Sequence, residues 1–172
     1  NEQGAIVELL FGCAIPVGIY ALPSLADYLE KNLSTAFLKT IAFRIETSLG
    51  ERDATQAAIG WALASYRFTP YLKDKPDSAF PALLWPAKVD KARARLMIEG
   101  LCLIKTLINT PANRLGTDEL AEAAAAVAKQ GRGTFLRIVD QELITQNFPM
   151  IYEVGKASPR RPQLIEINWG KD

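Results

Sequence analysis

The sequence contains no histidine in 172 residues. This absence excludes catalytic triads that use histidine, metal sites ligated by histidine, and the commonest general base of enzymes. Only two cysteines occur, Cys13 and Cys102, and two isolated thiols cannot build a zinc cluster. Because each has apolar neighbours, we expect two buried free thiols in a reducing, cytoplasmic setting rather than a disulfide.

The sequence also lacks an excess of either charge. Its 20 Lys and Arg face 19 Asp and Glu, which gives a net charge of +1. A dedicated binder of nucleic acid or of a membrane surface carries a clear basic excess, so the composition argues against both partners. The apolar run over residues 6–22 is interrupted by charged, proline and glycine residues, and no basic stretch precedes it. We therefore expect neither a membrane span nor a signal peptide there.

The chain is apolar enough to fold, with a proline-rich break near its middle. At 172 residues and 49% hydrophobic content it can bury a core as one domain or as two small ones. Prolines alternate with aromatic residues over 66–86, where regular structure should not persist. A helical period of apolar residues follows and predicts a connector helix. We predict a first domain over 1–86, a connector over 87–109 and a second domain over 110–172, both chain ends being cuts in a longer polypeptide.

The first domain is predicted to be of the α/β class. Short apolar runs over 4–12 and 15–22 favour two strands, and a third strand is predicted within 37–47. Ser24 is the predicted N-cap of a short helix between these strands. A second helix is predicted over 52–65, where many small residues would allow close packing against a sheet.

The stretch INTPANRLGTDELAEAA, residues 108–124, ends one predicted helix and begins another. Pro111 biases Thr110 out of the helical region and so ends the first helix. Thr117 is the predicted N-cap of the next one, and Asp118 and Glu119 would complement its dipole. Strand, helix and strand then follow over 133–169, which predicts the opening of an α/β domain with parallel pairing.

No active site is visible from the residues themselves. Gly155-Lys156 in MIYEVGKAS is similar to part of a phosphate loop, but Met150 stands where the first loop glycine is required, and the pattern favours a surface turn. Arg160 and Arg161 in SPRRP could hold a phosphate, yet a solvated loop or an interface contact is the favoured interpretation. The densest aromatic group favours core packing over base stacking; it comprises Trp61, Tyr66, Phe68 and Tyr71.

Three ordered motifs resemble the leucyl aminopeptidase (cytosol aminopeptidase) family. LIKTLINTPANRLGTDELAEAA, followed by NFPMIYEVGKASPRRPQLIEINWG, is similar to the passage that leads from that family's interdomain helix into its catalytic domain. WALASYRFTPY resembles the end of the family's N-terminal domain. The likeness covers most of the chain after Leu49 and is strongest over residues 106–170.

The resemblance implies a macro-like N-terminal α/β domain with a mixed sheet flanked by helices, a connector helix, and the truncated opening of an α/β catalytic domain. It also implies a homohexamer with two divalent ions, Zn²⁺, Mn²⁺ or Mg²⁺, which activate water and polarise the scissile carbonyl of a peptide. In the family, carboxylates and a lysine hold these ions, and that lysine follows the strand that corresponds to residues 164–169. Lys156 lies in an earlier segment, so no metal role is transferred to it.

The resemblance therefore predicts no catalytic, cofactor-binding or metal-binding residue within these 172 residues. We expect the chain alone to be inactive and to hold no ion, and the parent protein to be a cytoplasmic, metal-dependent aminopeptidase that removes N-terminal residues from peptides. The alternative is a non-catalytic assembly module, or one that binds a partner or nucleic acid, in a degenerate relative. A nucleotide ligand of the macro-like domain is a third reading, which no glycine-rich phosphate loop supports.

Overall fold

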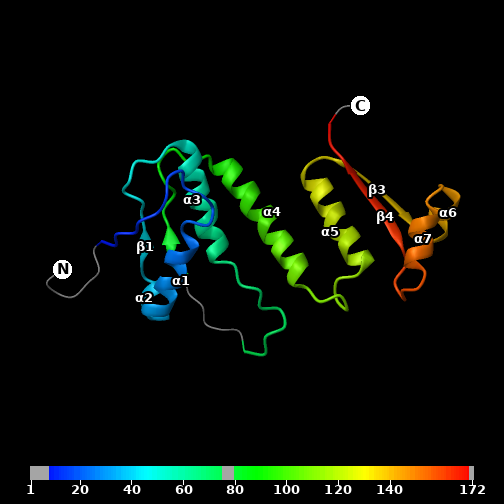
Figure 1. Ribbon diagram of the computed structural model, residues 1–172, viewed down its shortest axis with the longest axis horizontal. Coiled ribbons are helices and arrows are strands. Elements are labelled where there is room, and N and C mark those ends of the chain that lie inside the picture. The colour runs from blue at the N-terminus through cyan, green and yellow to red at the C-terminus, as the bar shows by residue number, and fades with distance from the viewer. Residues whose placement is uncertain (1–7, 75–79, 171–172) are drawn as a thin grey trace. The chain divides into compact units, whose positions relative to one another are not determined.

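The computed structural model describes residues 8–74 and 80–170. They form two compact units, 1–106 and 107–172 (Figure 1). Both units combine helices with a small sheet, so the predicted α/β class is confirmed. The division at residues 86 and 109 stays a prediction. Over the described ranges, no helix is long and apolar enough to cross a bilayer.

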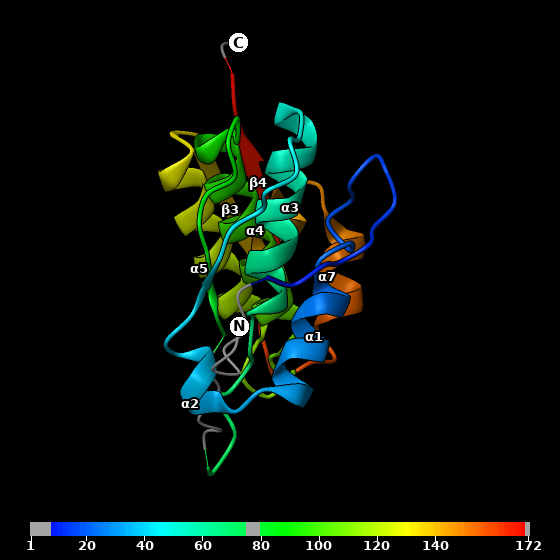
Figure 2. The same ribbon diagram turned by 90° about the vertical axis from the view of Figure 1, so that its left-hand side faces the viewer.

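The first unit places helices beside a short parallel pair of strands. In that pair, Ala42 lies opposite Ala82 and Phe43 opposite Leu83. α1 packs against α3 (Figure 2). The elements are α1 (Pro23–Asn32), α2 (Thr35–Leu38), β1 (Ala42–Phe43), α3 (Glu51–Ala64), β2 (Ala82–Leu83) and α4 (Lys91–Asn109), which continues into the second unit.

Trp61 of α3 is the largest side chain in the core of this unit and is only 5% exposed. Its Nε1–H donates to the Pro81 carbonyl oxygen at 3.0 Å. Its ring centroid lies 5.5 Å from that of Phe43 and 5.1 Å from that of Phe80, both in tilted geometry. The core-packing prediction is therefore confirmed for Trp61, whereas Tyr71 of the same aromatic group is half exposed.

The predicted strands near the N-terminus are wrong where the structure describes them. Residues 8–22 contain no strand, and the start of the first predicted strand lies outside the described residues. Leu9 and Val17 instead pack into the core as side chains of an irregular segment. Most other side chains of this segment are exposed, among them Leu10 and Ile15, so an apolar run alone decides neither burial nor strand pairing. Of the predicted strand over 37–47, only Ala42–Phe43 is paired.

The predicted helix after Ser24 exists, but Ser24 is not its cap. α1 begins at Pro23, and Leu22 occupies the N-cap position. Proline suits the first helical turn because its φ is preset and its missing N–H would have no helical partner. The Ser24 hydroxyl donates to the Ala21 carbonyl oxygen at 3.2 Å instead.

Neither cysteine is buried as predicted. Cys13 is exposed in the irregular N-terminal segment, and Cys102 is half-buried on α4. Both are free thiols, as expected. Cys102 is not fully buried because little of α4 is covered by other residues: Ala94 is its one buried residue, and Ile104 and Ile108 are mostly exposed.

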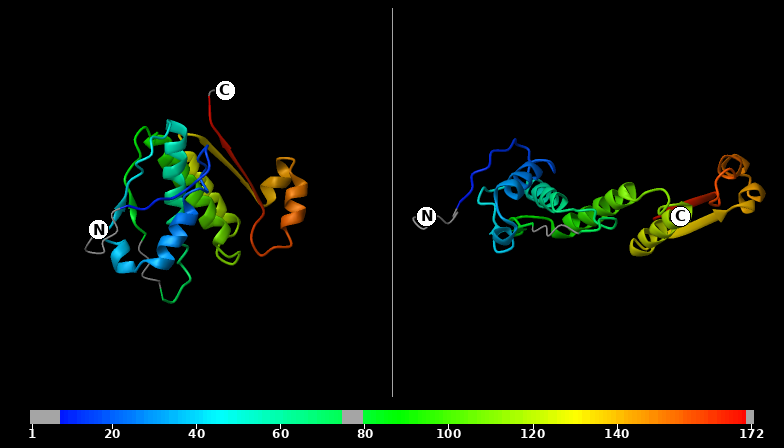
Figure 3. Two further views of the ribbon diagram at one scale, coloured as in Figure 1. Left: turned by 60° about the vertical axis from the view of Figure 1, so that its left-hand side comes forward. Right: turned by 90° about the horizontal axis from the view of Figure 1, so that it is seen from below.

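The second unit is a two-stranded sheet with α5 packed along it (Figure 3). Two short helices lie at one end of the strands, α6 against β3 and α7 against β4. Ala121, Ile138 and Leu143 are almost fully buried and come from α5, β3 and α6. The elements are α5 (Thr117–Gln130), β3 (Thr134–Val139), α6 (Gln141–Thr145), α7 (Pro149–Gly155) and β4 (Gln163–Asn168).

The parallel pairing predicted for this unit is wrong. β3 and β4 are antiparallel, with Thr134 opposite Asn168 and Val139 opposite Gln163. A parallel partner requires a crossover that carries the chain back along the whole strand. α6 has 5 residues and α7 has 7, so each spans only about 7–11 Å at ~1.5 Å per residue. The chain therefore re-enters the sheet at the end where it left.

Candidate functional site

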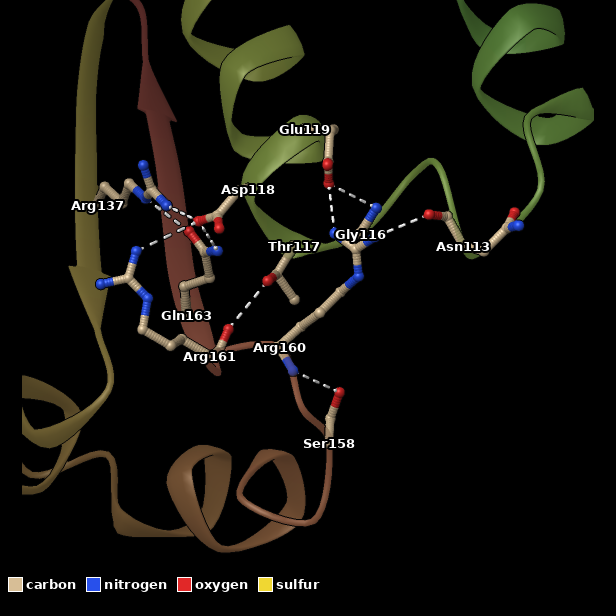
Figure 4. A network of polar contacts seen from close by, with 10 residues as sticks. All are labelled: Asn113, Gly116, Thr117, Asp118, Glu119, Arg137, Ser158, Arg160, Arg161 and Gln163. Atoms are coloured by element: carbon tan, nitrogen blue, oxygen red, sulfur yellow. Dashed lines mark hydrogen bonds and ion pairs between the residues drawn. The ribbon is translucent and has the colours of Figure 1, made fainter.

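The most extensive polar network described surrounds the start of α5 (Figure 4). Gly116, not Thr117, occupies the N-cap position, and Thr117 is the first residue of the helix. The Thr117 hydroxyl donates to the Arg161 carbonyl oxygen at 2.9 Å. The residue predicted to cap α5 therefore joins this helix to the loop that precedes β4.

Glu119 is the centre of one half of the network. Its Oε2 accepts from the Gly116 backbone N–H at 2.8 Å and from Arg160 Nη1 at 2.8 Å. The second terminal nitrogen of Arg160 donates to the Asn113 carbonyl oxygen at 3.0 Å. One arginine thus fixes both the turn before α5 and the carboxylate in its first turn.

Asp118 is the centre of the other half. Its carboxylate accepts from Gln163 Nε2 at 3.0 Å and forms an ion pair with Arg137. Arg137 Nε also donates to Gln163 Oε1 at 2.6 Å. Since Arg137 lies on β3 and Gln163 on β4, Asp118 ties the helix to both strands. Arg161 lies farther away, 3.8 Å from Asp118, and is mostly exposed.

The arginines of this network bind oxygen atoms of the same unit. Arg160 lies in a loop, as one of the two predicted alternatives has it, but its side chain donates through both terminal nitrogens to protein oxygens. The interface alternative stays a prediction. Charge-assisted hydrogen bonds of this kind give geometric specificity. The network can therefore hold a helix start, a loop and two strands in one geometry, which is a positioning role.

We expect the Glu119 carboxylate to contribute to the free energy of unfolding in a way that depends on pH. Hydrogen bonds from the backbone N–H groups of Glu119 and Gly116, and then from Arg160, hold the pKa of Glu119 below its ordinary value of 4.5. A depressed folded-state pKa adds stability above the unfolded-state pKa, and that stability is lost as the pH falls through the folded-state value. We expect Glu119→Gln to lower the free energy of unfolding at about pH 7, by an amount that shrinks towards zero below pH 4.5.

The measurement is urea unfolding at a series of pH values. Glu122→Gln is the matched control, because Glu122 is an exposed residue of the same helix. Its difference from the parent chain should not vary with pH in the same way. A Glu119→Gln difference that stays constant from neutral to acidic pH would contradict the assigned role.

Gly116 gives a second prediction at this site. A Cβ at Gly116 would lie 2.1 Å from Arg160 Nη1 and 2.4 Å from its Cδ. We expect Gly116→Ala to displace the guanidinium and break its contact with Glu119, which lowers the melting temperature. The effect should disappear largely in an Arg160→Ala background, because the displaced group is then gone.

Gly50→Ala is the control for this substitution. Gly50 is the N-cap of α3, as Gly116 is of α5, but a Cβ at Gly50 would meet no atom within 4 Å. Both changes carry the cost of alanine at an N-cap, about 1 kcal/mol or less. Circular dichroism melts that show equal losses for the two variants would rule out the Arg160 contact as the cause.

The Gly155-Lys156 pair is not part of a phosphate loop. Gly155 is the last residue of α7 rather than part of the predicted surface turn, and Lys156 caps that helix. A phosphate loop places its lysine at a helix N-terminus, where backbone N–H groups point at the anion, whereas these residues lie at a C-terminus. Lys156 pairs with Glu153, whose hydrogen bond raises the lysine pKa.

No group of three or more acidic or cysteine side chains comes together within residues 8–74 and 80–170. Asp118 and Glu119, the neighbouring acidic pair at the start of α5, are both engaged by arginine.

Comparison with known proteins shows which family this chain resembles. The model of the cytosol aminopeptidase family's catalytic domain matches residues 102–172. A probable cytosol aminopeptidase of Corynebacterium efficiens is 30% identical over 134 residues, which cover 73% of this chain and 26% of that protein. A probable cytosol aminopeptidase of Allorhizobium ampelinum is 31% identical over 147 residues, which cover 78% of this chain and 29% of that protein.

Solved structures agree with these relatives. The crystal structure of a cytosol aminopeptidase from Coxiella burnetii has a TM-score of 0.67 and 33% sequence identity, and the match covers 83% of this chain and 30% of that one. Residues 102–172 match the cytosol aminopeptidase catalytic domain, and most of the chain is similar to members of that family. A leucine aminopeptidase from Caenorhabditis elegans, 20% identical with a TM-score of 0.62 over 91% of this chain and 32% of that one, shares the fold.

The chain spans about a quarter to a third of the length of those relatives. The segment matched by the family model, 102–172, contains the whole polar network around α5. Two of the motifs that carried the family resemblance, residues 103–124 and 147–170, supply this network except for Arg137. Sequence reasoning assigned no role to Arg137 and Gln163, although a half-buried charged or amide side chain usually has a polar partner nearby.

Proposed function

We propose that the protein to which these residues belong is a metal-dependent aminopeptidase that releases N-terminal residues from peptides. The observation that carries the proposal is the match of residues 102–172 to the catalytic-domain model. The 33% identity to a cytosol aminopeptidase of known structure supports it. This chain would supply the start of the catalytic domain and the unit that precedes it.

The proposal includes two divalent ions, Zn²⁺, Mn²⁺ or Mg²⁺, of the kind that the family resemblance implies. The described residues do not fit such a centre, because two ions need several free carboxylates close together and the carboxylates of the α5 network are engaged by arginines. The ligands would therefore have to come from parts of the protein outside the described residues, and no catalytic step is assigned to this chain.

The direct test compares two lengths of polypeptide. The 172-residue chain, supplied with Mn²⁺, is expected to release no chromophore from a leucine anilide. The longer natural protein is expected to hydrolyse the same substrate and to lose that activity when a chelator removes the metal. Both measurements use the same absorbance assay, with circular dichroism to establish that the short chain is folded.

Each of the two measurements, on the short chain and on the longer protein, has an outcome that would contradict the proposal. Hydrolysis by the short chain would show that a catalytic centre exists within these residues. A folded, metal-loaded long protein without peptidase activity would favour a non-catalytic assembly or binding module instead.

We also propose that the longer protein is a homohexamer in the cytoplasm. The names of the relatives, cytosol aminopeptidases, support the compartment. The resemblance alone supports the hexamer, and light scattering on the longer protein measures it. A monomer at micromolar concentration would remove this part of the proposal without touching the peptidase activity.

A further inference from the structure

No further inference is drawn: the strongest candidate, the apolar cavity of about 750 Å³ in the first unit, lined by Leu9, Phe11, Ile15, Phe43 and Leu83 among others, lies on an unpartnered face, and nothing in the structure shows what covers it.

Discussion

Replacing Trp61 with alanine is expected to lower the free energy of unfolding of the first unit by about 3–5 kcal/mol, the usual cost of truncating a buried large aromatic. The indole is 5% exposed and contacts the rings of Phe43 and Phe80. Its removal leaves a cavity between α3 and both short strands and leaves the buried Pro81 carbonyl without its donor. Far-ultraviolet circular dichroism in urea measures the loss without relying on tryptophan fluorescence.

Trp61→Phe separates packing from hydrogen bonding. Phenylalanine keeps an aromatic ring against Phe43 and Phe80 but cannot donate to the Pro81 oxygen. An acceptor left unsatisfied in the interior costs roughly 1–3 kcal/mol, so this variant should fall between the parent chain and Trp61→Ala. A Trp61→Ala chain within about 1 kcal/mol of the parent, well below the usual cost of truncating a buried aromatic, would mean that Trp61 does not anchor this core.

The longer helices could be predicted from the sequence because their signals are local. The predicted helix over 52–65 is α3, Glu51–Ala64, within one residue at each end. The connector is predicted from residue 87, whereas α4 begins at Lys91, since the Asp90 carboxylate accepts from the Arg93 backbone N–H at 3.0 Å and so caps the helix there. Capping by a short acidic side chain is itself a sequence signal.

The two longer strands could be predicted from short runs rich in apolar and β-branched residues. TFLRIV and QLIEIN are predicted and present, but their antiparallel pairing depends on the length of the two helices between them, and the sequence predicts a surface turn where α7 ends. The apolar run over residues 8–22 carries the same local pattern as a strand. Whether such a run pairs or merely packs is decided by partners far away in the sequence.

Of the network around α5, the sequence predicts the carboxylates but not their arginine partners. Asp118 and Glu119 were recognised as carboxylates at a helix start, and that placement is confirmed. Their arginine partners lie 19 and 41 positions away in the sequence, Arg137 and Arg160 respectively. No periodicity relates residues at such separations, so only the fold brings them together.

Gly60→Ala is expected to destabilise the first unit although alanine is the better helix former. Gly60 is a buried residue within α3. A Cβ there would lie 2.3 Å from the carbonyl oxygen of Ile19 and 3.0 Å from its carbonyl carbon. These are backbone atoms, so no rotation of a side chain relieves the overlap, and α3 or the segment at Ile19 must move.

The expected size of that effect follows from two opposing contributions. Overpacking a well-filled interior costs about 1–3 kcal/mol and sometimes more, while alanine in place of glycine within a helix contributes about 0.5–1 kcal/mol in the other direction. The overlap should prevail, since a separation of 2.3 Å is far inside van der Waals contact. A net loss of about 1–2 kcal/mol corresponds to a melting temperature lower by roughly 4–16 °C for a unit of this size.

Gly100→Ala is the matched control for Gly60→Ala, because it places the same alanine in a helix interior where no backbone lies close to the new Cβ. Gly100 is exposed within α4, and a Cβ there would meet no atom within 4 Å. It should raise the free energy of unfolding by about 0.5–1 kcal/mol through helix propensity alone. Thermal melts of the two variants should therefore move in opposite directions. If Gly60→Ala is instead as stabilising as Gly100→Ala, α3 does not lie against the Ile19 backbone, and the close packing of the first unit's core is refuted.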